Sequence, residues 1–319
     1  MIARRLAHVG NVIVDVVMAI PALPTAGSDV LAAAAGMTPG AGFNVMAAAR
    51  RQGMRVVHGG VHGTGPFGDM VRRQLLAEGI EVARPARSGP DSGFCVALID
   101  DAGERTFITS VGAEATLGLE DLTALDVRPD DFVYISGYSL LSPITGPAVV
   151  QWLDVLPDTV TVLVDPQPLV AQVPAAILGP VLRRVDWWTC NETEATATTG
   201  LTDPAAAAAA IAARTGRAHV LVRAGAAGCL LLERGERPRS VRAYPVSAVD
   251  TNGAGDAHVG VFLATLAGGA SAYNSADRAN AAAALATTRF GPATSPNYAE
   301  LEQFLADHGP SAVPRVRRS

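Results

Sequence analysis

The sequence predicts an α/β fold in which a doubly wound, mostly parallel sheet is flanked by helices. Two observations lead to this prediction. In the second half of the chain, short runs rich in Val, Ile and Leu alternate with longer segments of helical character, the order that a parallel sheet with crossover helices requires. The chain also has 319 residues, of which 49% are hydrophobic and 17% charged, so it can bury a large core.

The first predicted strand covers residues 6–18, a Val- and Ile-rich run with Asp15 near its end. A single Asp there is usually a strand-end or turn residue. Parallel sheets, however, bind ligands at the carboxyl ends of their strands, so Asp15 is also a candidate ligand-binding residue. The chain then turns tightly at residues 39–44 and enters a helix that runs to about Gln52, and a strand follows at Arg55–His58.

Residues 63–68 read Gly-Thr-Gly-Pro-Phe-Gly and lie between a predicted strand and a predicted helix. This spacing occurs in dinucleotide-binding enzymes, so an NAD-dependent oxidoreductase is one alternative. Two features weigh against it. The next strand, residues 80–84, has no acidic residue at its end to hold a ribose, and the motif is not in the first βα unit. Pro66 at the first helical position and Phe67 in the core give a structural interpretation.

Two alternating segments, Phe94–Ile99 and residues 105–109, are joined by a polar turn and predict a β-hairpin. Arg105 opens the second strand. It is the one residue of the hairpin that could meet an anionic or polar substrate, although an arginine in a hairpin is usually solvated.

The remaining strands and helices alternate along the chain. We expect strands at residues 132–136, 161–165, 186–190, 219–223 and 229–233, and helices at residues 146–156 and 204–215. Asn191 and Glu194 start a further helix with the spacing of a capping box. Residues 223–228 connect two strands, as a plain hairpin turn would.

A glycine-rich junction before a helix is the strongest functional signal. Residues 250–256 read Asp-Thr-Asn-Gly-Ala-Gly-Asp and precede an apolar run, residues 259–266, with large side chains at helical spacing. Gly253, Ala254 and Gly255 leave their amides accessible, and the positive end of the helix dipole attracts anions. The junction therefore predicts a phosphate site.

Asp256 lies in the first turn of this helix, where a carboxylate would repel a bound phosphate. One interpretation is helix stabilisation, because acidic residues are favoured in first turns. The other is that Asp256 faces a second substrate and accepts the proton of a hydroxyl that attacks the bound phosphoryl group. The surrounding glycines favour the second interpretation.

The segment from Asp250 to His258 resembles the C-terminal signature of the ribokinase-like (phosphofructokinase B-type) carbohydrate kinases, with His258 where the family has Phe. The resemblance implies transfer of the γ-phosphate of ATP to a primary hydroxyl of a small sugar. Asp256 would be the general base, and the amides of Gly253, Ala254 and Gly255 the anion hole. It also implies one ribokinase-like domain over residues 1–319, with a small β lid formed by roughly residues 12–38 and 88–112.

The resemblance extends to the sugar side of such a site. The segment that ends in Asp15 is similar to the first family motif, whose Asp holds sugar hydroxyls, and Gly42 and Asn44 match a glycine and an amide that approach the sugar. Arg105 is the further substrate-binding candidate. Residues 63–68 also resemble a family block in which Gly65 replaces an Asp.

The nucleotide side is implied in the same way. Asn191 and Glu194 match an Asn-x-x-Glu motif whose carboxylate organises the water shell of Mg²⁺. The nucleotide-binding candidates are Arg223, Gly225 and Gly228, in a glycine loop, and Asn280, in a helix that borders the adenine in relatives. Asp250, Gly291 and Ser295 lie where some relatives bind a monovalent cation such as K⁺.

Composition excludes several function classes. All 25 basic residues are arginine, so a Walker A lysine and Schiff-base chemistry are excluded, and ATP phosphates must be held by amides, arginine and metal. The net charge of −5 argues against a nucleic-acid partner. No run is long and apolar enough to span a membrane, and the N-terminus does not read as a signal peptide. We therefore expect a cytoplasmic protein.

Several alternatives remain open at this stage. A nucleoside kinase would need an aromatic residue such as Phe94 or Phe107 to stack on a base. A dehydrogenase would bind a nicotinamide, and a sugar sensor would bind sugar without consuming ATP. The identity of the sugar is open. A homodimer through the lid is expected, because an uncovered lid sheet would have exposed edges.

Overall fold

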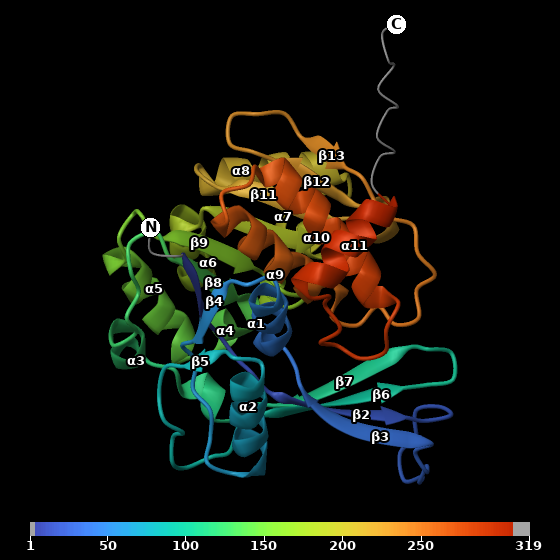
Figure 1. Cartoon of the computed structure of the whole chain (residues 1–319). Helices are drawn as coiled ribbons and strands as arrows, with labels where there is room; N and C mark the ends of the chain where they lie inside the picture. The colour runs from blue at the N-terminus through green and yellow to red at the C-terminus, as the bar shows by residue number, and fades with distance from the viewer. Residues whose placement is uncertain (1–3, 309–319) are drawn as a thin grey trace, which may run out of the picture.

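The computed structural model describes residues 4–308 and contains two separate sheets (Figure 1). The larger sheet has nine strands in the order β13-β12-β11-β10-β9-β8-β1-β4-β5. Their bounds are β1 (Arg5–Val9), β4 (Arg55–His58), β5 (Glu81–Val82), β8 (Phe132–Ser136), β9 (Thr161–Asp165), β10 (Trp187–Asn191), β11 (His219–Arg223), β12 (Cys229–Leu232) and β13 (Arg239–Val241). All neighbours pair in parallel except β11 with β12 and β12 with β13.

Helices cover both faces of the large sheet, because successive strand residues alternate between two cores. Val162 and Val164 of β9 pack into one core, and Leu163 packs into the other. The first core is covered by α3 (Leu119–Thr123), α4 (Gly137–Leu141), α5 (Thr145–Val155), α6 (Ala175–Arg184), α7 (Glu192–Thr199) and α8 (Pro204–Thr215). The second is covered by α1 (Gly42–Arg51), α2 (Pro66–Ala77), α9 (Ala254–Ala267) and α10 (Ala272–Thr287), and α11 (Tyr298–His308) packs outside α10. Three 3₁₀ turns are η1 (Ala113–Thr116), η2 (Val170–Gln172) and η3 (Gly225–Ala227).

The smaller sheet projects from the main body in Figure 1 and has the order β3-β2-β6-β7. Its strands are β2 (Val14–Ala19), β3 (Ala34–Pro39), β6 (Phe94–Ile99) and β7 (Arg105–Ser110). The predicted fold class, a mostly parallel sheet flanked by helices with an additional small sheet, is confirmed.

One element was predicted wrongly. The single strand expected at residues 6–18 is two strands, β1 and β2, which belong to different sheets. The chain leaves the large sheet at Gly10, and β2 pairs with β3 and β6. Asp15 is therefore a residue of the small sheet and does not end a strand of the large one. A continuous apolar run does not show where a chain passes from one sheet to another, because both sheets bury side chains of the same kind.

Candidate active site

Several polar residues gather at the carboxyl edge of the large sheet, among them the predicted site residues Asn191, Arg223 and Asp256. Asp165, Asn191 and Arg223 end the neighbouring strands β9, β10 and β11, whose carboxyl ends lie side by side. Asp256 lies in the first turn of α9. This is the edge at which parallel α/β sheets bind ligands.

The start of α9 leaves backbone amides free. Gly253 is the N-cap, with φ of 73°, and a Cβ there would lie 1.8 Å from the carbonyl oxygen of Pro292. Only glycine fits this position. Among residues 4–308, the amides of Gly255 and Asp256 donate to no protein acceptor, whereas that of Ala254 makes a long, 3.3 Å bond to Thr251. Two free amides at the positive end of a helix can hold an anion.

Asp256 is in direct contact with Asn44, although the two residues are 212 positions apart. The side-chain amide of Asn44 donates to Oδ2 of Asp256 over 2.9 Å. Burial raises the pKa of Asp256 to about 7; the bond from Asn44 opposes the rise, and the nearby charges of Asp165 and Asp15 add to it. The carboxylate thus has the proton affinity of a general base that works near neutral pH.

Asp15 reaches this region from β2 in the small sheet. Burial raises the pKa of Asp15 to about 6, and no hydrogen bond to its carboxylate is present among the described residues. A Cβ on Gly40 would lie 2.1 Å from Oδ2 of Asp15, so this glycine makes room for the carboxylate. At Gly42, a Cβ would lie 1.9 Å from Nε2 of the buried His8. The glycines of this turn are required by close packing.

Arg223 is held between two acidic residues. Its guanidinium lies 3.1 Å from Asp165 and 3.3 Å from Glu194, and donates to Oγ1 of Thr189 over 2.7 Å. Burial opposes its charge, but Asp165 and Glu194 hold the pKa of Arg223 above its ordinary range. Burial also raises the pKa of Glu194 to about 7. Arg223 borders the anion site, because a Cβ on Gly255 would lie 3.6 Å from its Nε.

Asn191 and Glu194 form the predicted capping box. The amide of Glu194 donates to Oδ1 of Asn191, and the amide of Asn191 donates to Oε2 of Glu194, both over 2.8 Å. Glu194 therefore contributes its charge from a fixed position. No group of three or more His, Cys, Asp or Glu residues within residues 4–308 is placed to hold a metal ion. Mg²⁺ needs only one or two protein carboxylates beside phosphate oxygens and water, so Glu194 and Asp165 fit that ion.

The other residues predicted to bind the nucleotide, Gly225, Gly228 and Asn280, make contacts that stabilise the fold. Gly225 and Gly228 have positive φ and close the hairpin turn between β11 and β12, as the turn prediction required. Asn280 is buried and donates to the carbonyls of Val241 and Arg242 over 3.3 and 2.8 Å, and its Oδ1 lies 3.1 Å from Nε2 of His258.

Arg105 forms an ion pair with Asp250. A cation at Asp250 would therefore have to displace this guanidinium. The hydroxyl of Ser295 is buried and has no hydrogen-bond partner within the described part of the chain.

Four amides of the glycine motif at residues 63–68 already donate to side chains of the protein. The carboxylate of Asp91 accepts from the amides of Gly65, Phe67 and Gly68 over 3.1, 2.9 and 2.8 Å. In a dinucleotide-binding loop such amides would hold a pyrophosphate. Here an aspartate of the chain itself takes that place.

Two polar residues of the site were not selected from the sequence. Asp165 is buried and paired with Arg223, and its position at the end of a predicted strand was an available signal. Asn11 has a buried Oδ1 without a hydrogen-bond partner in residues 4–308, and it lies in the segment that was singled out for Asp15.

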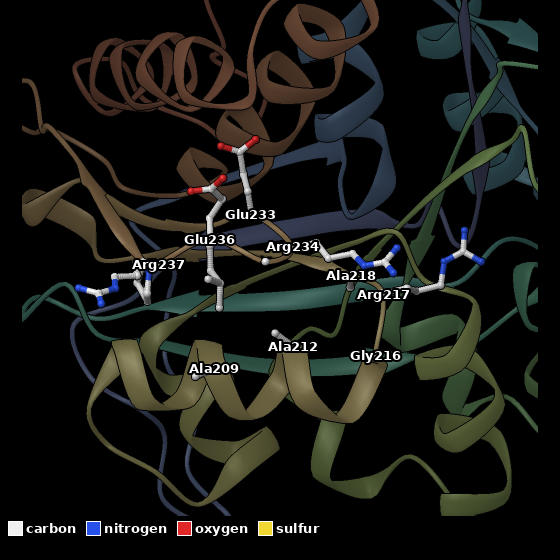
Figure 2. A pocket seen from close by; sticks show the side chains of 12 residues that line it. Ala209, Ala212, Gly216, Arg217, Ala218, Glu233, Arg234, Glu236 and Arg237 are labelled. Carbon is white, nitrogen blue, oxygen red and sulfur yellow. The ribbon is translucent and has the colours of Figure 1, made fainter.

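A separate depression lies at the opposite edge of the large sheet. This cavity of about 350 Å³ lies between α8 and the turn that follows β12. Figure 2 shows the side chains of Arg217, Arg234, Glu233 and Glu236 around it. It lies at the amino end of β11, and the site residues lie at the carboxyl end. It takes no part in the site.

The chain is similar to known carbohydrate kinases in sequence and in fold. The pfkB family carbohydrate kinase profile matches residues 3–298. The chain is 30% identical over 304 residues to the uncharacterized sugar kinase YegV of Escherichia coli, covering 92% of this chain and 91% of that protein. It is 25% identical over 257 residues to an adenosine kinase of Schizophyllum commune, with 74% of each chain covered. An Escherichia coli ribokinase II candidate in complex with ATP and Mg²⁺ superposes with a TM-score of 0.81 at 25% identity, over 96% of this chain and 100% of that one.

No helix among the described residues is long and apolar enough to cross a membrane.

Proposed function

Because the chain belongs to the pfkB family of carbohydrate kinases, we propose that it transfers the γ-phosphate of ATP to a primary hydroxyl of a small sugar. The observation that carries this proposal is the position of Asp256. Its carboxylate has a pKa raised to about 7 and lies in the same helical turn as two free amides. A base and an anion site are thereby held side by side.

Each residue of the site has a task in this reaction. Asp256 accepts the proton of the attacking hydroxyl, and the amides at the start of α9 stabilise the transferring phosphoryl group. Asn44 holds the carboxylate of Asp256 through its 2.9 Å hydrogen bond. Its own Oδ1 is buried without a partner among the described residues, so it can accept from a sugar hydroxyl. Asp15 accepts from a second hydroxyl.

The nucleotide is assigned to the carboxyl ends of β10 and β11. Arg223 and the turn at Gly225 and Gly228 lie beside the phosphates of ATP in this assignment. Asn280 stabilises the neighbouring backbone through its hydrogen bonds to the carbonyls of Val241 and Arg242. Glu194 and Asp165 would hold Mg²⁺ through water. When bound, this ion neutralises charge on the phosphates.

We also propose a cytoplasmic homodimer that is joined through the small sheet. Supporting this, the small sheet exposes large apolar side chains, including Met37, Phe107 and Ile108, which are 57%, 58% and 62% exposed. Pairing would cover both these side chains and the strand edges.

The replacement Asp256→Asn tests the proposed base. We expect turnover to fall by at least roughly 100-fold because the base is lost, while ATP affinity measured by calorimetry stays the same, because the amides remain. In the unmodified protein, kcat/KM should fall as the pH drops below about 7, where Asp256 becomes protonated. Unchanged turnover in Asp256→Asn would refute the assignment.

A nucleoside acceptor is the second candidate. Strand alternation places Phe107 on the same face of the small sheet as Thr109 and Asp15, and its side chain is 58% exposed. Phe94 lies on the other face, with its ring 5.2 Å from that of Phe67. A coupled ADP-release assay with ribose, fructose, 2-keto-3-deoxygluconate and adenosine separates the two candidates. Preference for adenosine, lost in Phe107→Ala, would favour the nucleoside.

A further inference from the structure

An ion pair connects the small sheet to the loop that carries the anion site. Arg105 is the first residue of β7, and Asp250 lies shortly before the N-terminus of α9. The two are 145 positions apart. Their side chains are 25% and 12% exposed, so the pair is partly shielded from water, where an ion pair is stronger than on an open surface.

Asp250 also organises the loop around the anion site. Its carboxylate accepts from the amide of Asn252 over 2.9 Å and from that of Gly291 over 3.0 Å. Asn252 directly precedes Gly253, and Gly291 directly precedes Pro292, whose carbonyl lies against Gly253. One carboxylate therefore fixes both segments that shape the start of α9.

The ion pair lines a cavity at the surface. A cavity of about 420 Å³ lies around it, between the turn at Gly103 and Glu104 and the loop at residues 248–251. On β7 beyond Arg105, the residues from Thr106 to Ser110 are exposed. The tip of the small sheet is thus joined to the loop by a charge contact that borders a cavity, and parting the two side chains would not disrupt a packed core.

We propose that Arg105 and Asp250 form a latch that couples closure of the small sheet over the acceptor to the geometry of the anion site. This inference rests on the proposed kinase function. Asp15, which we assign to the acceptor, belongs to the same sheet as Arg105. In the closed arrangement, which this structure represents, Arg105 pairs with Asp250 and stabilises the loop before Gly253. When the sheet opens, Asp250 loses its guanidinium partner and the loop is less constrained. Arg105 and Asp250 are positioning residues, because they act through the amides of α9.

The carboxylate of Asp250 stays charged near neutral pH. Burial opposes the charge of Asp250, but the amides of Asn252 and Gly291 and the guanidinium of Arg105 together lower its pKa. Protonation of Asp250 therefore does not release the latch in the neutral range.

The test compares Arg105→Met, Asp250→Asn and the double variant, with Asp101→Asn as control. Asp101 lies in the exposed turn of the same hairpin. Hydrogen exchange of the unliganded protein is followed in two peptides, one covering residues 99–105 and the other covering residues 248–253. We expect each single variant to speed exchange in both peptides, and the double variant to do no more than either single one. The control should match the unmodified protein.

Kinetics provide the second measurement. We expect kcat/KM for the acceptor to fall by roughly tenfold in all three variants, a size typical of coupling between sites, with ATP affinity nearly unchanged. Arg105→Lys should recover part of the loss, because it keeps the charge without the planar fork. If Asp250→Asn does not fold, Arg105→Met alone still tests the coupling, because Arg105 begins a strand that is mostly exposed.

Two outcomes would overturn the latch. Faster exchange confined to the mutated peptide would show that the segments are not coupled. Independent effects that multiply in the double variant, with acceptor KM raised only by Arg105→Met, would show that Arg105 contacts the substrate directly. The exchange result does not depend on activity, so coupled exchange in a protein without kinase activity would refute the proposed function and leave the coupling in place.

Discussion

At the scale of single residues, the site concentrates carboxyl groups whose pKa values are raised. Burial raises the pKa of Asp15 to about 6, and those of Glu194 and Asp256 to about 7. Each group is therefore harder to ionise in the folded protein than in the unfolded chain. In their ionised form these carboxyl groups destabilise the fold until a substrate hydroxyl, a proton or a metal ion compensates their charge.

The replacement Asp15→Asn tests whether the ionised carboxyl of Asp15 lowers the stability of the fold while it serves to bind the acceptor. Because the pKa of Asp15 is raised on folding, its carboxyl does not destabilise the fold below pH 4, destabilises it increasingly between about pH 4 and 6, and does so fully above that range. We expect Asp15→Asn to raise Tm by a few degrees at pH 8 and to leave it unchanged near pH 3.5, as measured by scanning calorimetry. The acceptor KM should rise at the same time.

Asp29→Asn is the control for this experiment, because Asp29 is an exposed aspartate in the connection between β2 and β3. It should change neither Tm nor KM. A lower Tm for Asp15→Asn at pH 8 would contradict the interpretation.

At the scale of elements, α9 places the anion site, and its glycines have different tasks. Gly253 has φ of 73° and lies against the carbonyl of Pro292, so its task is to let the loop turn into the helix. Gly255 is helical, and a Cβ there would make only an ordinary contact with Arg223, at 3.6 Å. Its task is to keep space open beside the amides.

Alanine substitutions separate these tasks. We expect Gly253→Ala to destabilise the fold by roughly 2 kcal/mol or more, because the new methyl group strains the backbone and meets Pro292. Gly255→Ala should retain stability but lose turnover, because the methyl group occupies space next to the anion site. Urea unfolding and initial rates provide the two measurements.

The matched control is Gly179→Ala in α6, where the nearest atom to a new Cβ is 3.7 Å away. Because Pro180 follows it and disfavours a side chain in helical conformation at this position, the change in stability should stay within about 1 kcal/mol, and turnover should be unchanged. Equal stability losses for Gly253→Ala and Gly255→Ala would contradict the assigned tasks.

At the scale of the whole molecule, a buried ion pair and the site residues lie at opposite edges of the large sheet. The site lies at the carboxyl ends of the strands. At the amino ends, Nε of Arg5 lies 2.8 Å from Oδ2 of Asp131, and the two side chains are only 5% and 4% exposed. This buried ion pair joins the starts of β1 and β8, far from any residue of the site.

We expect Asp131→Ala to destabilise the protein by about 3–5 kcal/mol, because it leaves the buried charge of Arg5 without its main partner. Turnover measured well below the new Tm should be unchanged. The control is Asp69→Ala in the exposed pair with Arg72, which should change stability by less than about 0.5 kcal/mol. A fall in turnover after Asp131→Ala would show that the two edges are coupled.

Much of the fold could be predicted from the sequence, because its signals are local. The strands β4, β8, β9 and β11 were predicted with their observed bounds, since each is a short apolar run between turn residues. The capping box at Asn191 and the helix that starts after Gly253 were also predictable. Hydrophobic spacing, capping and glycine conformation depend on residues a few positions apart.

Other features were decided by tertiary structure. The passage of the chain from β1 to β2 between two sheets, the capping of the glycine motif at residues 63–68 by Asp91, and the pairing of Arg105 with Asp250 all join distant segments. So does the contact between Asn44 and Asp256, two residues that the resemblance assigned to the sugar and its hydroxyl without showing that they touch each other. The sequence by itself determined which groups could perform the chemistry. Only the packing of helices and sheets decided which of them meet, because contacts across more than a hundred residues depend on how whole elements fit together.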